Sequence, residues 1–258
     1  MFHTRTHRCT VHEHLGHDAL PLACRQFPRM SVLDPRGVSV TLSHYCPTAS
    51  TLIQYDGYGR YDRYDGYDRY GGDIVINPAG FPPGGEYVGL DARDALPPLL
   101  RRDLLMDWDA WWHLEERAVA TLLHRGASAD EAVAMLRAVV ARLGLWRPGG
   151  QRLIDAVNDA FTDRDTAPAT VRAGTLVKRV LATVPDAYRE RAAWTGHVDT
   201  PDPVTRRFLA AHAFANWPVH RQNGGLPAWL ESIETARAFL SEGAGVQQAD
   251  LVLRHLCE

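Results

Sequence analysis

The sequence has little excess charge of either sign and no long hydrophobic run. Its 258 residues contain 28 Lys and Arg against 31 Asp and Glu, for a formal net charge of -3 at pH 7. Sequence-independent binding to nucleic acid needs a strong excess of basic residues, so we expect no nucleic-acid partner. No stretch approaches the roughly 20 consecutive apolar residues that cross a bilayer, and the first residues lack the apolar core of a secretory signal. We therefore expect a cytoplasmic protein with no membrane partner.

Cysteine is scarce and unevenly placed. Cys9, Cys24 and Cys46 all precede residue 54, and Cys257 stands near the other end of the sequence. In a reducing compartment such thiols are metal ligands, reactive groups or small buried residues more often than halves of disulfides. The spacing C-x14-C-x21-C lacks the close Cys pairs that are typical of structural zinc sites. Spacing alone therefore leaves open a metal site and a set of scattered buried cysteines.

Histidines are dense in the same stretch and could supply further ligands. The segment His12-Glu13-His14-Leu15-Gly16-His17 is not a zinc-protease helix, because that motif needs a second His four positions after the first, where this chain has Gly16. His14 and His17 could share one face of a helix. Solvated polar side chains are the alternative interpretation.

Composition divides the chain into three parts. Residues 1–54 are rich in Cys and His and include a predicted β-hairpin over 31–42, where β-branched residues flank the turn sequence Asp34-Pro35-Arg36-Gly37. Residues 55–85 hold a low-complexity repeat of Tyr, Asp, Arg and Gly followed by an irregular linker. Residues 86–258 carry helical patterns throughout. The predicted fold class is mainly α: a multi-helix array behind a small N-terminal segment that contains the hairpin.

The repeat places a Tyr at every third position from Tyr55 to Tyr70. A period of three matches neither a core-facing helix nor a half-buried strand, so we expect a solvated loop. A Tyr/Arg binding segment is the functional alternative.

Helical signals in the last part are strong. An apolar stripe runs at helical spacing from Leu104 to Leu122, and Ser128 with Glu131 forms a capping box at the start of the next helix. Pro203 and Pro227 stand where first helical turns are expected. Further helices are predicted over 151–162, 170–183, 186–194, 202–216, 227–242 and 246–256.

Three consecutive landmarks resemble one known family. They are Arg8-Cys9-Thr10-Val11-His12-Glu13, then Leu20-Pro21-Leu22-Ala23-Cys24-Arg25-Gln26-Phe27-Pro28-Arg29, then Leu42-Ser43-His44-Tyr45-Cys46-Pro47-Thr48-Ala49. Their order resembles that of the YkgJ-type cysteine-cluster family of zinc- or iron-chelating proteins, and within it most closely the flagellin lysine-N-methylases. The resemblance covers about the first 54 residues with specific motifs, and beyond them only a general helical layout.

The resemblance implies that Cys9, Cys24 and Cys46 ligate a zinc ion or an iron-sulfur cluster. Three thiolates and one histidine, His12 or His7, would complete a tetrahedral zinc site. Arg25 would then lie beside a thiolate, with a surface salt bridge as its alternative role, and Phe27 would screen the site from water.

The chain also departs from the family. Relatives carry further cysteines, in a Cys-x-x-Cys-Cys-like group, upstream of the position that matches Cys9. We therefore expect either a start further upstream or an incomplete site. Cys257 is far away in the sequence and would have to fold back to serve as a fourth thiolate.

Activity is implied by the resemblance alone. It suggests a protein-lysine N-methyltransferase that uses S-adenosylmethionine on a protein substrate such as flagellin. The glycines at 80, 84, 85, 149 and 150 lack the strand-turn-helix context of a dinucleotide-type fold, and no catalytic residue can be matched. A helical interaction protein with a vestigial metal site is the third interpretation.

Polar residues near one predicted helix are a further candidate site. His212 and Asn216 share a face at helical spacing, and Arg206 and Arg207 precede them. This group could bind a peptide or a cofactor, and a solvated helix face is the simpler interpretation.

Overall fold

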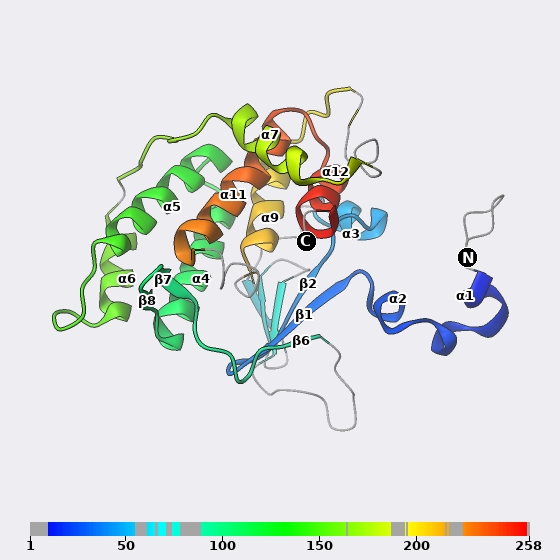
Figure 1. The fold of residues 1–258 in the computed structure, drawn as a ribbon, viewed down its shortest axis with the longest axis horizontal. Coiled ribbons are helices and arrows are strands. Elements are labelled where there is room, and N and C mark those ends of the chain that lie inside the picture. The colour runs from blue at the N-terminus through cyan, green and yellow to red at the C-terminus, as the bar shows by residue number, and fades with distance from the viewer. Residues whose placement is uncertain are drawn as a thin grey trace.

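The structure is a computed structural model that describes residues 10–54, 61–64, 67–70, 74–77, 89–163, 165–186, 194, 196–214, 216 and 224–256. The fold is mainly α, as the sequence predicts. Figure 1 shows the helices between residues 108 and 241 gathered at one side, with the sheet below them and the helices before residue 27 reaching away from the body.

The predicted hairpin is present. Strands β1 (Arg29–Asp34) and β2 (Gly37–Leu42) pair antiparallel from Arg29 opposite Leu42 to Asp34 opposite Gly37. The Asp34 carboxylate accepts a hydrogen bond of 2.9 Å from the backbone N–H of Arg36, which stabilises the turn. The turn sequence therefore acts as expected.

The hairpin lies inside a larger sheet that the sequence does not predict. The added strands are β3 (Tyr61–Tyr64), β4 (Tyr67–Tyr70), β5 (Ile74–Asn77) and β6 (Leu90–Asp91). The strand order is β3-β4-β5-β2-β1-β6, and among these described strands only the β1/β6 pair is parallel. Strands from all three compositional parts of the chain thus pair in one sheet.

The expectation of a loop is wrong for the described residues of the Tyr repeat, because β3 and β4 are paired strands. Both have the sequence Tyr-Asp-Arg-Tyr, which is self-complementary when two copies run antiparallel. The backbone register sets Asp62 opposite Arg69 and Arg63 opposite Asp68. Periodicity along one strand could not reveal this, because the complementarity exists only between strands.

The helical body follows a short two-stranded ribbon, β7 (Leu99–Arg101) and β8 (Leu104–Leu105). The apolar stripe expected from residue 104 therefore begins in a strand, and the helix begins only at Trp108, where the Asp107 carboxylate caps the Ala110 N–H at 2.8 Å. The main helices are α4 (Trp108–Leu123), α5 (Ala129–Gly144), α6 (Leu153–Thr162), α7 (Ala173–Thr183), α9 (Asp202–Ala213) and α11 (Leu226–Ser241).

Other helix predictions are confirmed. Ser128 and Glu131 form a reciprocal capping box on α5, and the prolines at 203 and 227 lie in first turns. The helix expected over 246–256 is α12 (Val246–Asp250) continued by the π-helical segment η2 (Leu251–Leu256). Most of the helix expected over 186–194 lies outside the described residues.

Helix α9 is the centre of the core. All of its residues from Val204 to Ala213 are buried, and it packs against α4, α5 and α11. Beside it the indoles of Trp111 and Trp229 meet edge to face with ring centroids 5.8 Å apart, and the Trp229 indole N–H donates to the Ala213 carbonyl at 3.0 Å. Among the described helices, none is long and apolar enough to cross a membrane.

Candidate metal centre

The hairpin brings two of the three predicted thiols to its open end. Cys24 lies on α2 (Leu22–Gln26), just before β1, and Cys46 directly precedes α3 (Pro47–Leu52), just after β2. The backbone N–H of Ser43 donates to the Pro28 carbonyl at 2.7 Å and extends the pairing past Arg29 and Leu42. Figure 1 shows α2 and α3 at the same end of β1 and β2. Cys24 and Cys46, which are 22 positions apart in sequence, therefore both lie on segments at the open end of the hairpin.

The segment that carries Cys46 is held by a buried carboxylate. Asp250 Oδ2 accepts hydrogen bonds from the Ser43 hydroxyl at 2.8 Å and from the Tyr45 backbone N–H at 3.0 Å. The Cys46 N–H donates to the Ser43 carbonyl at 3.3 Å. These bonds fix the turn from which Cys46 starts α3.

Asp250 is itself held by a buried arginine one helical turn later. Arg254 Nε donates to Asp250 Oδ1 at 2.8 Å, Nη2 donates to the Ala211 carbonyl at 3.1 Å, and Nη1 lies 3.4 Å from the sulfur of Met30. Asp250 is fully buried and Arg254 is 4% exposed. The C-terminal helix therefore ties α9 to the hairpin and to the Cys46 turn.

The first two residues of the turn are buried and the next two are at least partly exposed. Ser43 and His44 are buried, and the His44 ring meets Phe208 edge to face with centroids 5.7 Å apart. Tyr45 is exposed and Cys46 partly exposed. The buried pair anchors the turn while the thiol faces outward.

The N-terminal arm, residues 10–26, packs little on the body. It consists of α1 (Thr10–Leu15), the single turn η1 (His17–Ala19) and α2. No residue of α1 is buried, His12 and Cys24 are exposed, and Leu20 is the arm's buried residue among those with a described environment. Because so little surface is buried, moving the arm disrupts few contacts.

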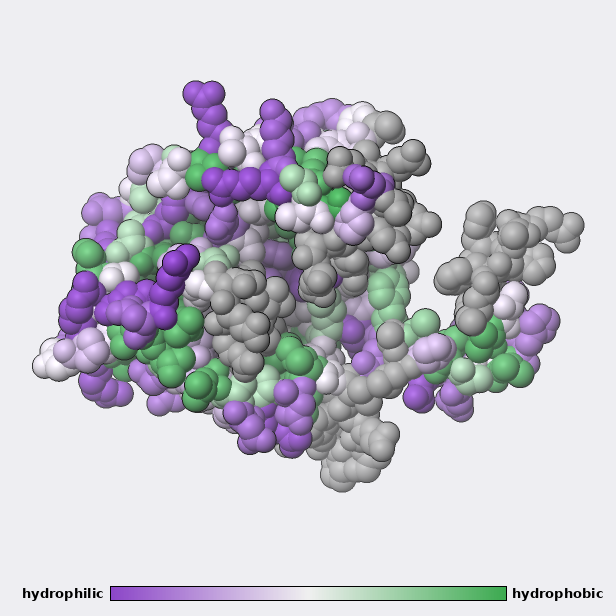
Figure 2. Space-filling model, viewed as in Figure 1, coloured by the Kyte–Doolittle hydropathy of each residue, from purple (hydrophilic) through white to green (hydrophobic). Residues whose placement is uncertain are grey.

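Exposed apolar side chains belong to the same region. Leu15, Phe27, Tyr45 and Leu52 are between 37% and 70% exposed, and Figure 2 shows apolar surface on the arm at the right of the molecule. Large apolar groups beside a thiol can shield a bound metal from water when they close over it.

Cys24, Cys46 and His12 carry side chains that can ligate a metal, but the structure does not group them into a metal site. Thiolate and imidazole are the ligands that zinc prefers, and thiolates hold iron-sulfur clusters. Within the part of the chain that the structure describes, no three His, Cys, Asp or Glu side chains are grouped closely enough to hold a metal ion. Cys9 and His7 lie outside the described residues.

The polar group on α9 is part of the core rather than a solvated face. Arg206 donates to Asp202 Oδ2 at 2.9 Å and to the His124 carbonyl at 2.8 Å, and Arg207 donates to the Ile53 carbonyl at 2.5 Å. His212 is 2% exposed and stacks on Phe208 at 6.1 Å. The interpretation of this group as a solvated helix face is therefore wrong. The two arginines instead donate hydrogen bonds to backbone carbonyls inside the fold.

A second buried charge cluster was not predicted from sequence. Arg36 donates to Glu115 Oε2 at 2.7 Å and to Asp34 Oδ2 at 3.0 Å, and both carboxylates are buried. Burial alone would lower the pKa of the Arg36 guanidinium, but the carboxylates of Glu115 and Asp34 raise it overall. The cluster fastens the hairpin turn to α4.

Comparison with known proteins gives no relative: no family model, no curated protein and no solved structure matches this chain.

Proposed function

We propose that this chain binds a metal, zinc or an iron-sulfur cluster, through cysteine thiolates at the open end of the hairpin. The observation that carries the proposal is the β1/β2 register, which directs the segments bearing Cys24 and Cys46 to one end of the sheet. Both thiols are free and accessible to solvent. His12 would come from the arm, and Cys9, which lies outside the described residues, directly precedes the arm in sequence.

Closing the arm is the step that would complete the ligand set. The arm has almost no packing of its own, so the free energy of metal binding would determine its position. Phe27 and Tyr45 would then cover the thiolates and keep water from the metal.

The C-terminal helix makes a fourth thiolate possible. Cys257 would have to fold back to reach the other thiols, and the described residues before it return to the hairpin, where Asp250 contacts Ser43 and Arg254 contacts Met30. Cys257 itself lies outside the described residues, one position after Leu256. We include it as a candidate donor, since four thiolates are the usual ligand set of an iron-sulfur cluster.

Bound zinc would act here as a structural crosslink, and an iron-sulfur cluster would add electron transfer. Methyl transfer from S-adenosylmethionine to a lysine of a protein such as flagellin is the enzymatic extension of the proposal. It is supported by family resemblance, and we assign no catalytic side chain to it.

A titration of metal-free protein with zinc tests the proposal. We expect one zinc per chain for the parent and a loss of at least about tenfold in affinity for Cys24→Ser and for Cys46→Ser, because each removes a thiolate. His12→Gln should weaken binding, whereas the matched change His14→Gln on the same helix should not. Unchanged affinity in both cysteine variants would overturn the assignment.

The same samples test closure of the arm. Hydrogen exchange of residues 10–26 should slow when zinc is added to the parent and should not change in Cys24→Ser. Slowing that is equal in the two proteins would show that the arm responds to something other than thiolate ligation.

A further inference from the structure

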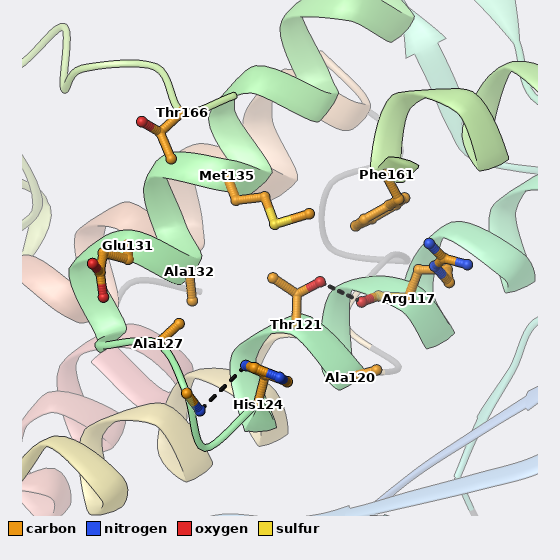
Figure 3. A pocket seen from close by; sticks show the side chains of 11 residues that line it. Arg117, Ala120, Thr121, His124, Ala127, Glu131, Ala132, Met135, Phe161 and Thr166 are labelled. Carbon is orange, nitrogen blue, oxygen red and sulfur yellow. Dashed lines mark hydrogen bonds between the residues drawn. The ribbon is translucent and has the colours of Figure 1, made fainter. Parts of the chain in front are cut away.

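A cleft on the helical body, distinct from the cysteine region, has the features of a small-molecule site. It lies between α4, α5 and α6 and has a volume of about 510 Å³, within the usual range for ligand pockets. Figure 3 shows Met135 and Phe161 facing each other over the helix that carries Arg117, Thr121 and His124. The hollow exists because Ala120, Ala127 and Ala132 occupy positions where larger side chains would fill it.

Arg117 is the cation of the cleft, and it lacks an acidic partner among the described residues. Its guanidinium lies over the Phe161 ring, 5.3 Å from the centroid. That contact orients the planar group without neutralising its charge. A guanidinium held in this way can pair with a carboxylate through two parallel hydrogen bonds.

His124 supplies a hydrogen-bond donor further along the same helix. The Gly126 backbone N–H points at His124 Nδ1 at 3.3 Å, so a neutral ring carries its proton on Nε2. Arg117 and His124 are seven positions apart, about 10 Å along a helix. Arg117 and His124 therefore lie at the two ends of the cleft, with alanine side chains between them.

Glu131, the carboxylate that lines the cleft, is already engaged. Its Oε2 accepts hydrogen bonds from the Ser128 N–H at 2.7 Å and from the Ser128 hydroxyl at 2.8 Å. These bonds lower the pKa of the Glu131 carboxyl. Because this carboxylate caps α5, it is not available to neutralise Arg117.

We propose that this cleft binds a small monocarboxylate with an elongated apolar body. The carboxylate would pair with Arg117, and the body would lie along Ala120 and Ala132 beneath Met135. A polar group at the far end of the ligand would meet His124 Nε2. The proposal does not depend on the metal site, since it uses none of the cysteine-bearing segments.

Calorimetric titration with three ligands of the same chain length tests the proposed chemistry. Octanoate should bind, while octan-1-ol and octylammonium should bind at least about tenfold more weakly, because only the carboxylate pairs with Arg117. Equal binding of octanoate and octan-1-ol would overturn the role of the charge. Absence of octanoate binding would overturn the proposal.

Variants locate the site. Arg117→Gln should weaken octanoate binding about tenfold or more, while Arg125→Gln, which makes the same charge change on a neighbouring exposed residue, should leave it unchanged. Ala120→Phe places a ring in the cleft from an exposed position and should also abolish binding. Unchanged circular dichroism would confirm that these variants fold. Parent-like binding by Arg117→Gln would show that octanoate binds elsewhere.

Discussion

The Ser43 hydroxyl donates a 2.8 Å hydrogen bond to the buried carboxylate of Asp250, 207 positions later in the chain. Through this bond the C-terminal helix holds the turn that presents Cys46. The candidate metal centre therefore depends on both ends of the described chain, although Cys24, Cys46 and His12 all come from the N-terminal end.

Asp250→Ala should lower the free energy of unfolding by about 3 to 5 kcal/mol. The substitution leaves Arg254 buried without its carboxylate and removes the acceptor of Ser43 and Tyr45. Chemical denaturation followed by circular dichroism measures the change.

Asp130→Ala is the matched control for that experiment. Asp130 pairs with Arg237 at 2.9 Å but is largely exposed, so its loss should change stability by about 1 kcal/mol or less. Similar effects of the two substitutions would contradict a special role for Asp250.

Arg36→Met should destabilise the protein by about 3 kcal/mol or more, because the buried carboxylates of Asp34 and Glu115 lose the guanidinium that they share. Adding Asp34→Asn and Glu115→Gln to the same chain should recover part of the loss, since neutral amides are less costly to bury than carboxylates that have lost this guanidinium. Denaturant titrations of the single and triple variants make the comparison. A triple variant that is less stable than Arg36→Met would contradict this account.

Asp91 should titrate unusually low. Side-chain hydrogen bonds from Arg93 hold the pKa of the Asp91 carboxyl at about 2, below its ordinary value of 3.8. A depressed pKa in the folded state contributes stability above pH 3.8 that is lost as the pH falls through 2, and exposure to solvent keeps this contribution small. Carbon-detected NMR titration should show the low value in the parent and a return toward 3.8 in Arg93→Gln.

Ser128→Ala should cost about 1 kcal/mol of stability, because it removes the hydroxyl that caps the Glu131 N–H at the start of α5. Ser128→Asp should restore most of it, since a carboxylate also accepts at this position. Thermal unfolding of the three proteins provides the test, and an alanine variant as stable as the parent would exclude a contribution from the cap.

Much of the fold follows from short-range signals in the sequence. The turn Asp34-Pro35-Arg36-Gly37 and the Ser128/Glu131 capping box act within a few residues, and both are present as predicted. The six-stranded sheet could not be predicted, because the pairing of β2 with β5 joins segments that have no common signal in the sequence. The pairing of the two Tyr-Asp-Arg-Tyr strands could not be predicted from periodicity either, because it depends on a match between two separate segments.

Only part of the candidate site could be predicted from the sequence. Cys24 and Cys46 were found by motif, and the hairpin between them explains why they share one end of the sheet. Asp250 and Arg254 were missed, although an acid and a base four positions apart on a predicted helix form a recognisable pair. Such a pair is usually solvent-exposed, and nothing in its spacing reveals that this one is buried against a distant turn.

Both described thiols should react with a disulfide reagent in folded, metal-free protein, because Cys24 is exposed and Cys46 is partly exposed. Zinc should protect both if they ligate the metal. Spectrophotometric counting of reactive thiols with and without zinc gives the answer, and a thiol that stays equally reactive with bound zinc is not a ligand.

The most direct test of the central claim is the metal content of the full chain, purified without oxygen and without a metal-binding tag. We expect about one zinc per chain, or several irons with matching sulfide, and a loss of that metal in Cys24→Ser while the helical body stays folded. A parent protein without metal, or a Cys24→Ser variant with undiminished metal, would contradict the assignment of the hairpin end as a metal centre.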